Sequence, residues 1–173
     1  MNINPLYTNK NTQKEIKKFY EQNGFIQLEN FIEGDIPNLE NLKFEKVYNP
    51  IYISKKINKD FKLEIENFEN FIKEITNSNQ INLTLNQYEH KDFIILNDKT
   101  PKDDTIDIIL DFTSNWKKEF GGILTYTTKD TEIFYLEPKY NTLTIVNKPK
   151  EVMKYLKYIN NKANNTKILR FEN

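Results

Sequence analysis

The chain contains no cysteine, which excludes thiol catalysis, disulfides, iron–sulfur clusters and cysteine-based zinc sites. It contains a single histidine, His90, so no metal site can draw two imidazoles from one chain. Arginine is equally scarce: Arg170 is the only arginine among the 25 basic residues. Arginine supplies the planar fork that grips guanine and phosphate, and the net charge is zero, so no nucleic-acid partner is expected.

Long apolar runs and targeting segments are missing as well. No stretch of about 18 apolar residues occurs, so no membrane span is expected. The N-terminus has no basic region followed by an apolar stretch, which predicts no signal peptide and a cytoplasmic protein. A length of 173 residues with 38% hydrophobic and 13% aromatic residues is enough for one folded domain over 1–173.

The first part of the domain, residues 1–80, carries helical and mixed patterns. Apolar residues at helical spacing predict a helix over 12–22, with Thr12 and Glu15 as a capping box. A second apolar stripe predicts an amphipathic helix over 61–75. This part is expected to support the rest of the domain.

From residue 81 the apolar pattern changes to a period of two, which is typical of strands. Strands are expected over 81–85, 93–96, 105–112, 123–126, 132–136, 142–146 and 167–171, while 152–159 fits a strand or a helix. Helices followed by many short strands favour a mainly β sandwich or barrel with helices packed on one face.

Four motifs occur in order in the second half. They are His90-Lys91-Asp92, the segment 107–116 (DIILDFTSNW), the segment 119–124 (EFGGIL) and the segment 138–143 (PKYNTL). From about residue 88 to 171, this ordered set resembles the iron(II)- and 2-oxoglutarate-dependent dioxygenases, in particular their prolyl-hydroxylase-like branch. The resemblance implies an α+β protein whose core, residues 81–173, is a double-stranded β-helix of the jelly-roll, cupin-like kind.

The resemblance also implies a metal site, which this sequence only partly matches. The family holds Fe(II) with two histidines and one carboxylate, and leaves the other positions to 2-oxoglutarate and oxygen. His90 and Asp92 match the first histidine and the carboxylate, whereas the second histidine falls at Lys154. A lysine ammonium has no lone pair for the metal. The site is therefore interpreted as degenerate, with Lys154 either paired to Asp92 or simply solvated.

The family's cosubstrate pairs with a basic residue on the last strand, and two candidates exist here. Strand alternation with Lys167 facing inward would place Leu169 and Phe171 on the same face. A shift of one residue would instead turn Arg170 inward. Tyr88 is expected to add a hydroxyl group to the same site.

Three functions remain open at this stage. The first is a dioxygenase-fold protein with little or no activity, acting as a binding or structural module. The second is an active protein hydroxylase that uses Fe(II) and 2-oxoglutarate with His90, Asp92 and either Glu151 or water as ligands. The third is a non-enzymatic β-sandwich that binds a protein partner through an edge strand or a tyrosine-rich surface. In the family, loops around the barrel mouth select the substrate, and the corresponding segments here are 97–104 and 127–131.

Overall fold

The structure is a computed structural model that describes residues 1–79, 81–96 and 103–173. Its helices are α1 (Pro5–Thr8), α2 (Lys10–Asn23) and α3 (Phe68–Thr76), with short 3₁₀ turns η1 (Lys118–Phe120) and η2 (Asn161–Ala163). Its strands are β1 (Asn2–Ile3), β2 (Phe25–Glu29), β3 (Ile32–Glu33), β4 (Glu45–Asn49), β5 (Ile53–Asn58), β6 (Thr84–Tyr88), β7 (Phe93–Ile94), β8 (Thr105–Asp111), β9 (Leu124–Thr127), β10 (Glu132–Leu136), β11 (Thr142–Lys148), β12 (Met153–Leu156) and β13 (Ile168–Glu172). None of the helices in these described ranges is long and apolar enough to cross a membrane.

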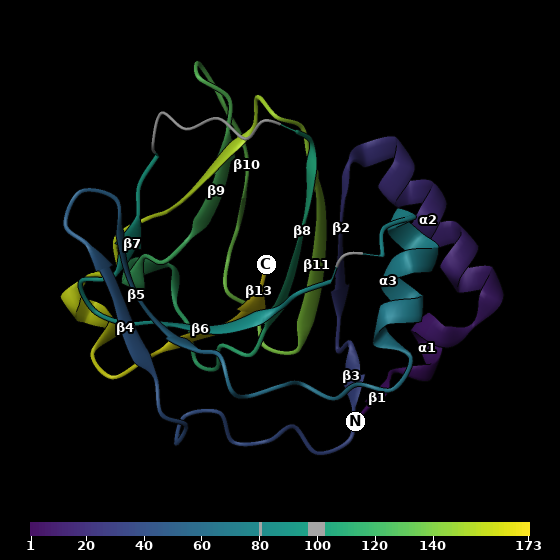
Figure 1. Cartoon of the computed structure of the whole chain (residues 1–173), viewed down its shortest axis with the longest axis horizontal. Helices are drawn as coiled ribbons and strands as arrows, with labels where there is room; N and C mark the ends of the chain where they lie inside the picture. The colour runs from purple at the N-terminus through teal and green to yellow at the C-terminus, as the bar shows by residue number, and fades with distance from the viewer. Residues whose placement is uncertain (80, 97–102) are drawn as a thin grey trace.

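All described strands except β1 and β3 form one antiparallel sheet that rolls into a barrel-like shape (Figure 1), and β1 pairs with β3 in a separate two-stranded sheet. The strand order is β10-β9-β12-β7-β5-β6-β13-β8-β11-β2, and β4 extends from β5. The strands expected in the second half are present, and segment 152–159 contributes the strand β12 rather than a helix. Three strands from the first 80 residues also enter the sheet, because β2 pairs with β11, β5 pairs with both β6 and β7, and β4 pairs with β5.

Two hydrophobic cores lie on opposite sides of the sheet. The helices α2 and α3 pack beside β2 and β11, as Figure 1 shows, and cover the outer core. The inner core fills the barrel and includes Tyr88, Tyr126 and Leu156. Period-two alternation along β8, β11 and β13 therefore sends one set of side chains to the outer core and the other set into the barrel.

Both expected helices exist, but their starts differ from the prediction. The helix α2 begins earlier, and its cap is Asn9, whose side-chain oxygen accepts from the amides of Asn11 and Thr12. Thr12 thus lies inside the helix, and the predicted capping box is wrong. The helix α3 begins only at Phe68.

The segment before α3 explains the second difference. Phe61, Leu63 and Ile65 pack against the outer core from an extended chain. Their spacing of two residues is a strand-like period, although it also overlaps the helical stripe that begins at Phe61. Asn67 then adopts a φ of 59°, a left-handed conformation that separates the extended segment from the helix.

Candidate functional site

The strand β8 carries two acidic side chains into the barrel. Asp107 and Asp111 lie on the same face of β8 as Ile109, which belongs to the inner core. Both aspartates are buried. An unpaired buried carboxylate is strongly disfavoured, so each requires partners inside the barrel.

The strand β13 supplies the matching charge. Ile168 belongs to the inner core, while Leu169 and Phe171 pack with the outer core beneath the helices. Arg170 and Glu172 therefore face the interior with Ile168. The orientation predicted first, with Leu169 and Phe171 turned inward, is wrong, and the alternative register is the one found.

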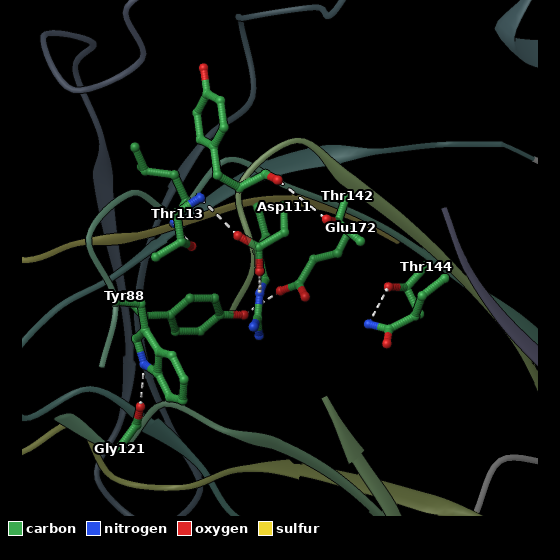
Figure 2. Close-up of polar contacts among 12 residues, drawn as sticks. Tyr88, Asp111, Thr113, Gly121, Thr142, Thr144 and Glu172 are labelled. Carbon is green, nitrogen blue, oxygen red and sulfur yellow. Dashed lines mark hydrogen bonds and ion pairs between the residues drawn. The ribbon is translucent and has the colours of Figure 1, made fainter. Parts of the chain in front are cut away.

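Arg170 and Asp111 form an ion pair in the middle of the barrel. The two residues are opposite each other in the β13–β8 register, and Nε of Arg170 lies 2.6 Å from Oδ2 of Asp111. The other oxygen of Asp111 accepts from the amide of Thr113 at 2.8 Å, as Figure 2 shows. Only 1% of Arg170 is exposed. Burial alone would lower the pKa of Arg170, but the charge and hydrogen bond of Asp111 together with the nearby Glu172 and Tyr88 outweigh it, and the pKa is raised.

A second group of polar contacts involves Glu172. The hydroxyl of Tyr88 donates to Oε1 of Glu172, and the two side chains point toward one another in Figure 2. The ammonium of Lys55 lies 3.9 Å from the same oxygen. Burial and the neighbouring Glu172 charge raise the pKa of Tyr88 well above its usual value. Tyr88 therefore remains a neutral donor, engaged with the protein itself.

A third group is centred on Asp107. Its Oδ2 accepts from the hydroxyl of Tyr126 at 3.0 Å and pairs with the ammonium of Lys154 at 2.9 Å. Burial, followed by the charge of Asp107, raises the pKa of Tyr126. We call the three groups together the interior network; its members are Lys55, Tyr88, Asp107, Asp111, Tyr126, Lys154, Arg170 and Glu172.

Lys154 is thus inside the barrel, but it does not contact the residue predicted for it. Its partner is Asp107, whereas Asp92 accepts from the hydroxyl of Ser54 at 2.5 Å and from the amide of Glu89 at 2.9 Å. The proposed pairing of Lys154 with Asp92 is wrong. Asp92 instead holds the turn after β6 against β5.

His90 lies in this same turn, between β6 and β7. Its ring packs edge-on against Tyr158, with 6.2 Å between the ring centres. Its Nδ1 is buried and has no hydrogen-bond partner among the described residues. Over the described part of the chain, no three histidine or acidic side chains come together in a group able to hold a metal ion.

These residues do not fit the family's iron site. Fe(II) in such a site takes two imidazoles and a carboxylate, but one histidine exists and both oxygens of Asp92 are engaged with protein donors. Lys154 presents a cation that is already paired with Asp107. The described residues therefore do not form an iron site of the family's kind.

Of the two cations predicted for the cosubstrate, Arg170 is paired through Nε, while its Nη1 is buried without a hydrogen-bond partner among the described residues. Arg170 lies beside a cavity of about 10 Å³, lined among others by Asp111, Thr142 and Thr144. Such a volume holds roughly one water molecule, whereas small-molecule pockets begin near about 300 Å³. Lys167 precedes β13 and lines an open surface depression of about 780 Å³. Neither cation has space for a dicarboxylate inside the barrel.

The acidic members of the interior network were not predicted from the sequence. A usable signal existed in β8, where Asp107 and Asp111 flank Ile109 at a spacing of two in an otherwise apolar strand. The same spacing relates Arg170 to Glu172. Charges that alternate with apolar residues on one face normally indicate a solvent-exposed face, so burial could be recognised only once both faces of the sheet were known to be covered.

Comparison of the chain with known proteins identifies its family. Residues 52–169 match the sequence model of the family described as "Oxoglutarate and iron-dependent oxygenase degradation C-term". Two curated relatives are prolyl 3-hydroxylases OGFOD1. The protein from Xenopus laevis is 31% identical over 84 residues, covering 46% of this chain and 16% of that protein. The protein from Mus musculus is 26% identical over 82 residues, covering 46% and 15%. The match thus spans about a sixth of each relative.

Solved structures show the same fold at low sequence identity. A Pseudomonas putida prolyl-4-hydroxylase aligns with a TM-score of 0.63 at 14% identity, over 92% of this chain and 96% of that one. A Trichoplax adhaerens prolyl hydroxylase, in complex with a hypoxia-inducible-factor oxygen degradation domain peptide fragment, aligns with a TM-score of 0.63 at 13% identity, over 97% and 90%. These neighbours confirm the expected double-stranded β-helix fold, and the family-model match over residues 52–169 confirms the relationship to the oxoglutarate- and iron-dependent oxygenases. The chain belongs to the oxoglutarate- and iron-dependent oxygenase degradation C-terminal family.

Proposed function

We propose that this chain is a non-catalytic member of its family that serves as a protein-binding module. The observation that carries the proposal is the Arg170–Asp111 ion pair inside the barrel, with space for about one water molecule beside it. A barrel packed in this way has no room for 2-oxoglutarate next to its interior cation. The single histidine of the sequence supports the same conclusion.

The alternative of an active hydroxylase has less support. It requires His90 and Asp92 to bind Fe(II) with Glu151 or water completing the ligand set. Glu151 is exposed at the turn before β12, and Asp92 holds Ser54 and the amide of Glu89. Binding iron there would require breaking both contacts of Asp92.

The edge strand β10 and its exposed apolar side chains support a role in protein binding. The strand β10 is the last strand of the roll and pairs only with β9 among the described strands. Its Ile133 and Tyr135 are 50% and 52% exposed. An end strand with exposed apolar side chains suits the addition of a partner strand. The peptide complex of the Trichoplax adhaerens structural neighbour is consistent with a protein partner.

Metal titration and turnover together test the non-catalytic role. Isothermal titration of the purified chain with Fe(II) or Mn(II) under anaerobic conditions, with and without 2-oxoglutarate, is expected to show no stoichiometric binding. Aerobic incubation with both is expected to yield no succinate above the level of the Asp92→Ala variant. One-to-one metal binding with succinate release that is lost in both His90→Ala and Asp92→Ala would overturn the proposal and establish the active alternative.

A further inference from the structure

A groove lies between two stretches of extended chain outside the barrel. Segment 59–67 connects β5 to α3, and segment 81–83 leads into β6 (Figure 1). The groove between them has a volume of about 1150 Å³ and is lined by both stretches and by the first turn of α3. Phe171, a buried member of the outer core, lies at its floor. The groove is therefore on the outer-core side of β13, whereas the interior network is inside the barrel.

The main chain along both walls of the groove is unpaired. The strands β5 and β6 pair with each other as far as Asn58 and Leu85. Beyond that point, no hydrogen bond of the described chain joins 59–67 to 81–83. The amides of residues 62–65 and 81–83 have no acceptor among the described residues either. Both walls thus present main-chain groups with which a further extended chain can pair.

Half-buried apolar side chains alternate with exposed ones along both walls. On the first wall, Phe61, Leu63 and Ile65 are half-buried, and the residues between them are exposed. On the second wall, Ile81 and Leu83 are half-buried on either side of an exposed asparagine. All five side chains pack against the outer core and line the groove. A strand lying in the groove would cover them with every second side chain.

The charges of the groove favour a basic occupant at one end. The charged side chains that line it are all exposed and form no ion pair with the described residues; they are Lys59, Lys62, Glu64, Glu66 and Glu69. The two lysines follow β5, whereas the three glutamates are at the end next to α3. The α-amino group of Met1, 3.4 Å from the carbonyl oxygen of Glu64, brings one positive charge to that end. Two negative charges remain there, which complement basic side chains.

We propose that this groove binds an extended peptide segment of a partner protein, which pairs as an additional strand with residues 81–83. The segment has about seven residues, which matches the extended wall and spans roughly 23 Å. Its alternate residues are apolar and contact Leu63 and Leu83, and its basic residues lie beside Glu64 and Glu66. This inference rests on the proposed protein-binding role, but it assigns the partner to a surface separate from β10.

Fluorescence anisotropy with labelled peptides tests the groove. The probe is a blocked Lys-Lys-Val-Thr-Val-Thr-Val peptide, and its control is Glu-Glu-Val-Thr-Val-Thr-Val. The probe is expected to bind with saturation, and the control at least about tenfold more weakly. The variant Glu64→Lys/Glu66→Lys, which changes only exposed side chains, should reverse this preference. The matched variant Glu15→Lys/Glu21→Lys, which reverses two exposed charges on α2, should bind the probe as the parent chain does.

Hydrogen exchange locates the bound probe. The amides of residues 81–83 are expected to exchange more slowly in its presence, while those of β10 stay unchanged. Slower exchange in β10, with binding lost in Tyr135→Ser but kept in Glu64→Lys/Glu66→Lys, would overturn the groove and still support protein binding through β10. Equal binding of the two peptides, or no saturation of the probe up to about 1 mM, would overturn the groove as well. The non-catalytic role is decided separately, by metal titration and succinate release.

Discussion

Arg170 of β13 and Asp111 of β8 are opposite each other in the sheet, and their contact of 2.6 Å joins the two strands inside the barrel. The pair is buried on every side. A buried ion pair adds little net stability over apolar residues of the same size, but removing one partner leaves the other charge uncompensated. The relationship therefore makes a specific prediction for single and double variants.

Arg170→Met is expected to lower the free energy of unfolding by about 3–5 kcal/mol, because Asp111 loses its counter-ion inside the barrel. The double variant Arg170→Met/Asp111→Leu is expected to be more stable than Arg170→Met, since it removes the stranded carboxylate. Urea unfolding followed by circular dichroism gives both values. If the double variant loses the sum of the two single losses, the residues are not coupled and the pairing is wrong.

Asp92 is expected to contribute to the stability of the fold rather than to metal binding. Asp92→Ala removes two acceptors, for the Ser54 hydroxyl and the Glu89 amide, and is expected to destabilise the chain by about 1–3 kcal/mol. Ser54→Ala removes one of these contacts and should cost less. The measurement is urea unfolding in the presence of a chelator, and again with Mn(II).

The matched outcome decides between a structural and a ligand role. A structural Asp92 predicts the same loss in both solutions. A loss that appears only when Mn(II) is present would show that Asp92 acts through a bound metal.

Sequence reasoning recovered the fold well because period-two patterns and turn residues are local signals. The strands β8, β10 and β11 were anticipated within two residues at each end, since their apolar residues alternate and turn-forming residues follow. The interior site was harder. The last strand carries charges at both parities, Lys167 against Arg170 and Glu172, so the pattern alone left its facing open.

The hydrogen-bond partner of Asp92 could not be predicted from the local sequence pattern. Ser54 is 38 residues away in sequence and reaches Asp92 only because β5 pairs with β7 in the rolled sheet. Likewise, Lys154 meets Asp107 because both β12 and β8 face the same interior from opposite sides of the barrel. Such contacts depend on tertiary neighbours, which a single sequence does not reveal.

Gly122 is predicted to tolerate a side chain less well than Gly24, because a side chain of the barrel interior lies close to it. A Cβ at this position would lie 2.2 Å from Cδ1 of Ile168, and the φ of Gly122 is +73°. Gly24 has nearly the same φ, +74°, but nothing within 4 Å of its Cβ position. Gly24→Ala should therefore report backbone strain alone, at roughly 1 kcal/mol. Gly122→Ala should lower the free energy of unfolding by about 1–3 kcal/mol more, because the new methyl group overpacks the interior.

Thermal unfolding of the two alanine variants compares them directly. The double variant Gly122→Ala/Ile168→Val should recover part of the extra loss, because it removes the methyl group that the new Cβ meets. Equal losses for Gly24→Ala and Gly122→Ala would contradict the close approach of Ile168.

The free energy of unfolding is expected to decrease steeply with rising alkaline pH because of the interior tyrosines. The pKa values of Tyr88 and Tyr126 are raised in the folded chain by burial and by their carboxylate partners. Their stabilising contribution is complete below the unfolded value near 10 and is lost as the pH rises above it, since the unfolded chain releases these protons first. Lys55, whose folded pKa is lowered, acts in the opposite direction below about pH 10.4, because the unfolded chain then binds more protons.

Tyr126→Phe should make the alkaline loss less steep by up to about 1.4 kcal/mol per pH unit, the contribution of one proton. The variant keeps the ion pair of Asp107 with Lys154, so the fold is expected to persist. The matched control is Tyr135→Phe, which removes the hydroxyl of an exposed tyrosine. Urea unfolding between pH 9 and 12 measures the slopes. If Tyr126→Phe matches the parent chain throughout this range, the hydroxyl of Tyr126 is not held as a neutral donor to Asp107.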